Sequence, residues 1–195
     1  MKVVLATGNA DKVVEIAPLL PGADVGTAPE GFDPEETGTT LFQNALIKAQ
    51  ALRPDADEDA LVLADDSGLV VHALGGRPGV FSSRYAGPDA TYDDNCRRLL
   101  SELEGVEDRR AAFVCVLVGL DARRDVLVAS GTCAGTIARS MRGSRGFGYD
   151  PVFVPEGEDR SMAEMTREEK AAISHRGRAV RRMAALLGLG GEGAR

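Results

Sequence analysis

Two adjacent carboxylates, Asp65 and Asp66, interrupt an otherwise apolar stretch of the chain. Leucine, valine and alanine fill residues 61–64 before them, and a second apolar run occupies residues 69–71 after a Ser-Gly pair at 67–68. Short apolar runs with β-branched residues are typical of buried strands. The pattern predicts a strand that carries the acid pair out of a hydrophobic interior into a Ser-Gly turn. Two charges placed there cost free energy unless they bind a cation or ligand or are fully hydrogen-bonded. Such a pair suits a Mg²⁺-dependent phosphate enzyme.

The composition limits the classes of protein that remain. A chain of 195 residues, 44% hydrophobic and 27% charged, can bury one substantial core, as one domain or as two closely packed lobes. No apolar stretch approaches the ~20 residues of a membrane helix, and the apolar N-terminal run is too short for a signal peptide. We therefore expect a cytoplasmic protein without membrane contact. The net charge of −7 excludes general affinity for nucleic acid polymers.

The cysteines indicate core residues rather than a metal site. Cys96, Cys115 and Cys133 are odd in number, far apart and without the spacing of a zinc site. We expect them to be reduced and buried.

Helical and strand patterns alternate along the chain. Helical spacing predicts helices over 11–20, from 40 to about 52, over 91–103, and from near 174 to before 188. Residues 3–6 predict a first strand, and the β-rich runs 111–120 and 126–137 predict an antiparallel hairpin. Residues 22–38, rich in Gly, Pro and acids, predict a loop. The sum is an α/β fold with a twisted mixed β-sheet flanked by helices, as one domain over 1–188 followed by a disordered tail at 189–195.

The segment from Thr7 to Lys12 joins the first strand to a helix. Backbone N–H groups and the positive end of the helix then point to one place, Gly8 lets a phosphate approach the backbone, and Lys12 supplies charge. The spacing of a Walker loop is absent. An ordinary turn capped by Asn9 or Asp11 is the alternative.

The acids are candidates for metal binding. Mg²⁺ prefers a few carboxylates together with substrate phosphates, and a carboxylate can also orient a water for attack. For Asp65 and Asp66, the alternative is a turn in which aspartate caps neighbouring N–H groups. For Glu35 and Glu36, a solvated charge pair in a loop is the alternative.

Two segments of the C-terminal half are candidates for contact with a base. The aromatic rings of the run Gly146–Pro151 could stack on a base while Asp150 accepts from its N–H edge; a tight turn with buried rings is the alternative. Further on, Lys170 and His175 could reach one site, with Arg176 beside them in the first turn of a Ser174-capped helix. A charged, solvent-facing helix is the alternative there.

Together these motifs closely resemble the inosine triphosphate pyrophosphatase family, also called the dITP/XTP pyrophosphatase family. Six segments match in the family's order and extend from Lys2 to about Leu187. They are LATGNADK, EETG with the downstream NALIKA, ADDSGL, GGRPGVFSSRYAG, GFGYDPVF and MTREEKAAISHRG. One departure is Gln43, where many family members have Glu, which weakens any role for an acid at that position.

The resemblance implies a site with assigned residues. Asp66 is the implied catalytic carboxylate and a Mg²⁺ ligand, with Glu35 or Glu36 as a second acidic contributor. The implied substrate contacts are Thr7, Gly8, Asn9, Ala10, Asp11, Lys12, Ser67, Phe147, Gly148, Tyr149, Asp150, Lys170, His175 and Arg176. The residues leave open whether Asp66 acts as a general base, a ligand or both. Base selection is assigned to Arg176, donating to O6 of the purine, and to Asp150, accepting from N1–H.

The resemblance further implies two lobes with the active-site cleft between them, a homodimer, and Mg²⁺-dependent hydrolysis of dITP, ITP and XTP to the monophosphate and pyrophosphate. Two other functions remain open. The first is a pyrophosphatase for other damaged or modified bases, and the second is a nucleotide sensor that binds without turnover. The retained charges at Lys12, Asp66 and Lys170 argue against the sensor.

Overall fold

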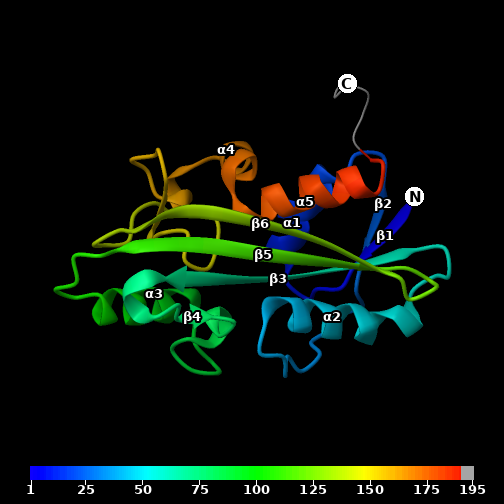
Figure 1. Cartoon of the computed structure of the whole chain (residues 1–195), viewed down its shortest axis with the longest axis horizontal. Helices are drawn as coiled ribbons and strands as arrows, with labels where there is room; N and C mark the ends of the chain where they lie inside the picture. The colour runs from blue at the N-terminus through cyan, green and yellow to red at the C-terminus, as the bar shows by residue number, and fades with distance from the viewer. Residues whose placement is uncertain (190–195) are drawn as a thin grey trace. The chain divides into compact units, whose positions relative to one another are not determined.

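One mixed β-sheet carries the fold in the computed structural model, which describes residues 1–189. Its strands are β1 (Lys2–Leu5), β2 (Asp24–Thr27), β3 (Leu61–Val71), β4 (Pro78–Gly79), β5 (Arg110–Leu120), β6 (Val126–Ile137) and β7 (Phe153–Pro155) (Figure 1). The order is β2-β1-β3-β5-β6-β7, with β4 paired to β3. β1 runs parallel to β2 and β3, whereas β4 is antiparallel to β3 and β7 is antiparallel to β6. This confirms the predicted α/β class with a mixed sheet flanked by helices.

Five helices accompany the sheet in the described part of the chain. They are α1 (Ala10–Ile16), α2 (Leu41–Leu52), α3 (Tyr92–Glu102), α4 (Arg167–Ile173) and α5 (His175–Leu186). None of them is long and apolar enough to span a bilayer.

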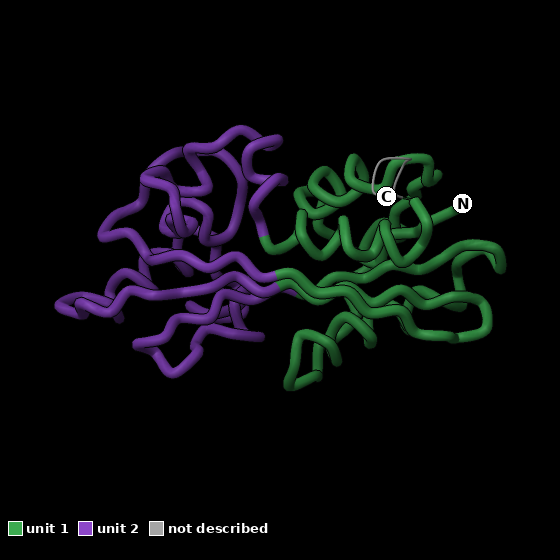
Figure 2. The backbone as a smooth tube through the Cα atoms, turned by 45° about the horizontal axis from the view of Figure 1, so that its top comes forward, with its two compact units in different colours: residues 1–66, 115–131, 175–195 green, residues 67–114, 132–174 purple. Residues whose placement is uncertain are grey.

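The chain divides into two compact units, each built from separate stretches of sequence (Figure 2). Unit 1 comprises residues 1–66, 115–131 and those from 175 onward, and unit 2 comprises 67–114 and 132–174. The predicted tail at 189–195 lies outside the described residues except for Leu189, whose amide donates to the Ala184 carbonyl over 2.8 Å.

Unit 1 places helices on both faces of its part of the sheet, with α1 and α5 on one face and α2 on the other (Figure 1). In β3, Leu61 and Leu63 pack in the cluster that includes residues of α1 and α5, and Val62 and Ala64 pack in the cluster that includes α2. Successive side chains of a strand point to opposite faces. The two acids that follow in β3 therefore face different helices.

Unit 2 has its own core. Residues of β3, α3, β5, β6 and β7 form it, and the rings of Phe113 and Phe153 pack with centroids 4.7 Å apart. Cys96 and Cys133 lie in this core, and Cys115 lies in unit 1. All three are buried and carry reduced thiols, as predicted.

The predicted turn at Ser67–Gly68 is wrong, because β3 continues through both residues to Val71. The extension is paired: Leu69 and Val70 lie opposite Gly79 and Pro78 of β4. Backbone pairing thus satisfies this segment without a turn.

Two further boundaries differ from the sequence prediction. β2 occupies part of the predicted loop at 22–38. The helix predicted over 11–20 ends at Ile16 and is followed by a 3₁₀ turn, Ala17–Leu19. Pro18 has no N–H to continue the α-helical hydrogen bonds, which accounts for the change.

Candidate active site

Asp65 faces α1 and α5 and is held there by two cations. Lys12 Nζ lies 3.1 Å from Oδ1, and the Arg176 guanidinium donates to Oδ2 from Nε at 3.2 Å and Nη2 at 3.1 Å. Arg176 also donates from Nη1 to Glu15 Oε2 at 2.5 Å. The Asp65 side chain has no exposed surface. The result is a network of two carboxylates and two cations, in which Asp65 and Arg176 are buried and Lys12 and Glu15 are partly buried.

The charges of this network keep Asp65 ionised. Burial by itself would raise the pKa of the Asp65 carboxyl, but Lys12, Arg176 and Lys48 hold it well below its usual range. Burial would likewise lower the pKa of Arg176, and Asp65 and Glu15 raise it instead. Asp65 is therefore a counter-ion rather than a proton acceptor.

Asp66 faces α2 and a different set of groups. Asn44 Nδ2 donates to Asp66 Oδ2 over 3.2 Å, and Lys48 Nζ donates to Oδ1 over 3.3 Å. Lys48 also donates to Glu36 Oε1 over 2.8 Å. Two carboxylates thus share one ammonium group.

The balance of charge at Asp66 is opposite to that at Asp65. Burial raises the pKa of Asp66, and the rise persists although Lys48 opposes it, because Glu36 and Asp65 add to it. For Lys48, burial acts to lower the pKa, but the three carboxylates raise it. Of the two aspartates, Asp66 is the better proton acceptor, and its negative surroundings favour a bound cation.

The start of α2 positions Asn44 and Lys48. Thr40 and Gln43 form a capping box, in which Gln43 N donates to Thr40 Oγ1 over 3.2 Å and Thr40 N donates to Gln43 Oε1 over 3.2 Å. Asn44 and Lys48 follow one turn apart, on the helix face toward β3. A glutamate at position 43 would form the same box. The Gln43 departure therefore concerns the helix cap.

The prediction that the backbone amides at the start of α1 point to a phosphate meets a competing acceptor in the structure. Asn9 caps the helix, accepting through its side chain from Asp11 N over 2.9 Å and from Lys12 N over 3.4 Å. The alternative of a capped turn is correct for these two amides, since a nearby side-chain acceptor is the usual partner of a first helical turn. Ala10 is the first helical residue.

The turn before α1 has no room for a side chain at Gly8. A Cβ there would lie 2.7 Å from the Phe32 carbonyl oxygen. Thr7 Oγ1 accepts from Asn9 N over 3.1 Å, which holds the turn in place. The segment thus brings its backbone close to the backbone of Phe32 and directs Lys12 to Asp65.

Unit 2 holds the predicted base-contacting segment. Asp150 Oδ2 accepts from Phe147 N over 2.9 Å and from Lys170 Nζ over 2.5 Å. Lys170 Nζ also lies 4.9 Å from the centroid of the Phe147 ring. Asp150 and Lys170 are buried. The three residues form a cluster with an ion pair behind an aromatic ring.

The side chain of Tyr149 does not belong to that cluster. It is buried in the core of unit 2 and donates from its hydroxyl to the Ser82 carbonyl over 2.9 Å. The alternative of a buried ring is therefore correct for Tyr149, and burial raises its pKa. Gly148 has a positive φ of 63°, which lets the chain turn between Phe147 and Tyr149.

The structure separates the remaining predicted residues. His175 is buried at the start of α5 in unit 1, Ser67 follows Asp66 in β3, and Glu35 is exposed beside Glu36. Phe147 to Asp150 and Lys170 lie in unit 2, whereas Thr7 to Lys12, Asp66, His175 and Arg176 lie in unit 1.

Three contributors were missed by the sequence prediction. Asn44 and Lys48 bind Asp66, and Glu15 binds Arg176. Their helical spacing held a signal, because Lys48 lies four residues after Asn44 and Glu15 lies three after Lys12.

The donor set fits a hard divalent cation. In residues 1–189 no group of three or more His, Cys, Asp or Glu side chains could hold a metal ion. Mg²⁺, however, usually takes one or two protein carboxylates and completes its shell with phosphate oxygens and waters. Asp66 and Glu36, joined through Lys48, meet that requirement, and they favour Glu36 over Glu35 as the second acid.

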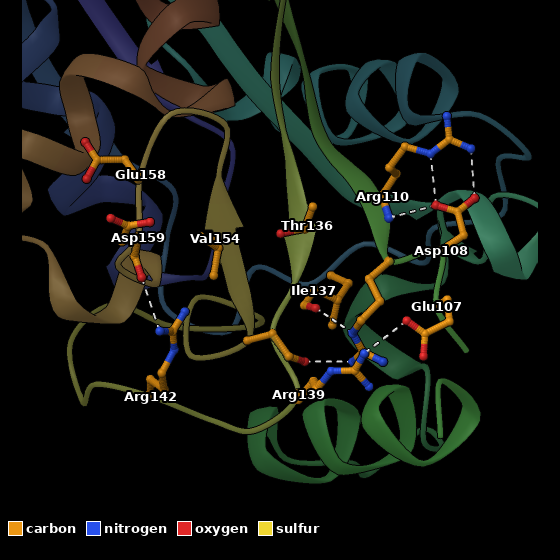
Figure 3. Close-up of a pocket in the computed structure, with 12 residues that line it drawn as sticks. Glu107, Asp108, Arg110, Thr136, Ile137, Arg139, Arg142, Val154, Glu158 and Asp159 are labelled. Carbon is orange, nitrogen blue, oxygen red and sulfur yellow. Dashed lines mark hydrogen bonds and ion pairs between the residues drawn. The ribbon is translucent and has the colours of Figure 1, made fainter. Parts of the chain in front are cut away.

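A cavity of about 560 Å³ lies elsewhere in unit 2 (Figure 3). The arginines that line this cavity have acids or carbonyl oxygens as partners. Arg110 pairs with Asp108, and Arg139 pairs with Glu107. None of the predicted site residues lines it. Its remaining lining residues are Arg109, Thr136, Ile137, Ala138, Arg142, Val154, Glu158 and Asp159.

Residues 3–186 match the model of the Ham1 family. The chain belongs to the Ham1 family. It is 50% identical over 188 residues to a dITP/XTP pyrophosphatase of Shigella flexneri, covering 92% of this chain and 94% of that protein. A dITP/XTP pyrophosphatase of Treponema denticola is 46% identical over 186 residues, covering 92% and 95%. The family membership inferred from the motifs is confirmed.

Solved Ham1 structures share the fold. The Staphylococcus aureus Ham1 protein superposes with a TM-score of 0.85 at 39% identity, covering 96% of this chain and 98% of that one. A HAM1 protein from Coxiella burnetii gives a TM-score of 0.83 at 40% identity, covering 97% and 100%.

Proposed function

We propose that this Ham1-family chain hydrolyses non-standard purine nucleoside triphosphates (dITP, ITP and XTP) to the monophosphate and pyrophosphate, with Mg²⁺, and so removes them from the nucleotide pool. The names of its relatives support this substrate class. The observation that carries the proposal is the setting of Asp66. It is a buried carboxylate with a raised pKa that shares Lys48 with Glu36.

The reaction joins a water oxygen to the α-phosphorus and breaks the bond from that phosphorus to the oxygen bridging to the β-phosphate. Asp66 is placed to accept the proton of the attacking water. Pyrophosphate leaves with most of the negative charge, so positioned cations contribute most of the catalysis. Lys12 and Lys48 supply two of them. A bound Mg²⁺, held by Asp66 and Glu36, would neutralise phosphate charge.

The phosphate end of the substrate is assigned to the segment from Thr7 to Lys12 and to Ser67. Lys12 supports this assignment through its charge, whereas the space beside Gly8 is taken by the Phe32 carbonyl oxygen. Since Asn9 accepts from the first amides of α1, the contribution of that segment rests on Lys12 rather than on those amides.

The base end is assigned to the Phe147–Asp150 segment with Lys170, and to His175 and Arg176. Phe147 offers a ring for stacking, and Asp150 an acceptor for N1–H. Arg176 already donates to Asp65 and Glu15, so reading O6 requires it to share these bonds. Arg176→Ala should change the relative rates on ITP and ATP. Unchanged relative rates would remove Arg176 from base selection.

The deciding experiment is pyrophosphate release from ITP, XTP, dTTP and ATP, each with Mg²⁺ and with a chelator. ITP and XTP should be preferred, and the chelator should abolish release. A preference for dTTP would favour the alternative of a pyrophosphatase for other modified bases. Tight ITP binding without release would favour the sensor.

Two matched variants test the acids. Glu36→Gln should raise the Mg²⁺ concentration needed for half-maximal rate, since one of the two carboxylates is lost. The exposed neighbour provides the control, and Glu35→Gln should leave that concentration unchanged. An effect of the control variant alone would reverse the assignment.

A homodimer, which rests on the family resemblance, and a cytoplasmic location complete the proposal. Phe81, 56% exposed with Arg84 5.3 Å from its ring centroid, is a candidate for the dimer contact. Light scattering should give about twice the 20.5 kDa of one chain, and the monomer mass would overturn this part of the proposal.

A further inference from the structure

Tyr92 is an exposed aromatic residue beside the proposed base-contacting segment. It is the first residue of α3, and its ring packs on that of Phe147 with centroids 5.9 Å apart and planes inclined by 45°. Its exposure of 43% is unusual here, because Tyr85 and Tyr149, the other two tyrosines of the chain, are buried. A tilted arrangement at this distance is an attractive geometry for aromatic rings.

The position of Tyr92 is fixed by the start of its helix. Thr91 and Asp94 form a capping box, with Asp94 N donating to Thr91 Oγ1 over 3.1 Å and Thr91 N donating to Asp94 Oδ2 over 3.0 Å. The helix therefore begins at one defined residue, and its first side chain leaves the backbone in one direction.

A second contact joins the same helix face to the same segment. Cys96 lies one turn after Tyr92 and donates from Sγ to the Gly148 carbonyl over 3.3 Å. Residues four apart share a face of a helix. α3 thus contacts the segment at two residues one turn apart, Cys96 through the Gly148 carbonyl and Tyr92 through the Phe147 ring.

A further constraint on Phe147 comes from the buried ion pair of Asp150 and Lys170. Asp150 binds both the Phe147 amide and Lys170, whose ammonium lies 4.9 Å from the ring centroid. The backbone of Phe147 is held by Asp150, and its ring is contacted by Lys170 and Tyr92. The ring is only partly buried, and both of these neighbours contact it.

We propose that Tyr92 is a positioning residue for nucleotide binding: it fixes the plane of the Phe147 ring on which the purine base stacks. This inference rests on the proposed function, in which Phe147 contacts the base. The recognised ligand is the aromatic face of a purine nucleotide, and Tyr92 acts through Phe147 rather than on the phosphates.

Steady-state kinetics with ITP test the proposal. Tyr92→Ala should raise KM by roughly 3- to 10-fold and leave kcat within about 2-fold, because a positioned ring contributes to binding in ground and transition states alike. Tyr92→Phe keeps the ring and should restore the wild-type KM. Tyr92→Leu keeps apolar bulk without a ring and should behave like the alanine variant.

A binding measurement separates positioning from a general loss of structure. The chain has no tryptophan, so Phe147→Trp creates a single reporter at the ring itself. ITP should change its emission, and pyrophosphate, which has no base, should not. Adding Tyr92→Ala should weaken the ITP titration by a similar roughly 3- to 10-fold and leave pyrophosphate binding, measured calorimetrically, unchanged.

Each other outcome overturns the inference. An unchanged KM in Tyr92→Ala, a fall in kcat alone, or a phenylalanine variant that resembles alanine would exclude ring positioning. If the alanine variant does not fold, the leucine and phenylalanine variants decide. If the wild type hydrolyses ITP but Tyr92 has no effect, only this inference fails. If the wild type does not hydrolyse ITP, the proposed function fails, and an unresponsive tryptophan reporter in Phe147→Trp would exclude the role of Tyr92 as well.

Discussion

Asp65 and Asp66 are neighbours in one strand, yet their environments shift their pKa values in opposite directions. The alternation of β3 directs Asp65 to Lys12 and Arg176, which lower its pKa, and directs Asp66 to a site where burial raises its pKa although Lys48 opposes it. A pair of groups whose surroundings separate their pKa values is a common arrangement at sites of acid–base chemistry. One backbone segment thus supplies a fixed counter-ion and a proton acceptor.

The two aspartates should respond differently to neutralisation. Asp65→Asn leaves Arg176 and Lys12 without their main counter-charge in a buried place, and we expect a loss of about 3 kcal/mol in the free energy of unfolding. Asp66→Asn removes a carboxylate that burial disfavours, and the free energy should stay within about 1 kcal/mol of wild type while turnover falls at least ~10²-fold. Urea denaturation of both variants measures the first quantity and pyrophosphate release the second. Equal destabilisation would contradict the assignment of the two environments, and near-normal turnover in Asp66→Asn would remove it from the mechanism.

The raised pKa of Asp66 also sets the sign of a pH effect. A proton acceptor works only when ionised, so kcat/KM should fall with decreasing pH at a value above the ordinary carboxyl range near 4. Lys48 lowers the pKa of Asp66, and its removal in Lys48→Met should move this acidic limb to higher pH. pH–rate profiles of both proteins test the shift, whatever the absolute rate of the variant. A downward shift would mean that Lys48 does not act on the titrating group.

The sequence allowed the charged residues of the candidate site to be predicted, but it did not reveal which residues contact one another there. Asp66, Lys12 and the pair Glu35 and Glu36 were predicted from motifs, but the alternation that separates Asp65 from Asp66 was hidden by the mistaken turn at 67–68. Glu15 was missed because its partner, Arg176, lies 161 positions away in sequence. Only the packing of α1 against α5 reveals that pair.

At the level of elements, the contact of α5 with β6 depends on the glycine at position 131 of β6, which has no side chain. A Cβ at Gly131 would lie 2.1 Å from the His175 carbonyl oxygen and 2.6 Å from Ala179 N. Both are backbone atoms, which cannot rotate away as a flexible side chain would. The start of α5, which carries His175 and Arg176, can therefore lie against β6 only where the strand has glycine.

Substitution at this contact should be costly. Gly131→Ala is expected to lower the free energy of unfolding by about 3 kcal/mol, because overpacking must displace backbone. Gly26→Ala in β2 is the matched control: its Cβ would meet its nearest neighbour, Val4 Cγ2, at 3.9 Å, an ordinary contact, and the change should stay within about 1 kcal/mol. Thermal and urea unfolding of the two variants provide the comparison. A tolerated Gly131→Ala would show that α5 can move away from β6.

Local signals predicted α2, α3 and α5 well, missed α4, and predicted the strand lengths less well. The cap residues Thr40 and Thr91 mark the starts of α2 and α3, where side-chain hydrogen bonds fix the boundary. The length of β3 could not be predicted, since Ser-Gly is typical of turns, whereas β3 stays extended through both residues and pairs with β4 at Leu69 and Val70. Tertiary pairing overrides local preference there.

For the whole molecule, the division into units was not visible in the order of the sequence. Each unit is assembled from separate stretches, and β3, β5 and β6 contribute residues to both. Length and composition allowed one domain or two lobes, and the alternating elements allowed the α/β class. Three of the four boundaries fall within β3, β5 and β6, and the fourth falls between α4 and α5, so no long Gly/Pro-rich linker marks them.

The pH dependence of stability is also a property of the whole molecule. A carboxyl whose pKa is lowered by folding stabilises the protein above its unfolded pKa, and that contribution is lost as the pH falls toward the folded value. Among the carboxyls of the described residues, six have pKa values below the ordinary range, whereas the pKa of Asp66 is raised. The six are Asp65, Asp94, Glu102, Asp108, Glu164 and Glu169. We therefore expect Tm to be nearly constant from pH 7 to 5 and to fall as the pH drops below about 4.

High salt and the substitution Asp65→Asn can separate the contributions that surface and buried carboxyls make to this fall of Tm at low pH. Asp94, Asp108 and Glu169 are surface groups, and about 0.5 M NaCl should weaken their part by screening. Asp65 is fully buried, and its part should persist at high salt. Asp65→Asn, measured by calorimetry at high salt, should therefore have a flatter dependence of Tm on pH below 4 than the wild type. If the two curves stay parallel, the buried network of Asp65, Lys12 and Arg176 is not what acid disrupts, and the surface carboxyls account for the transition.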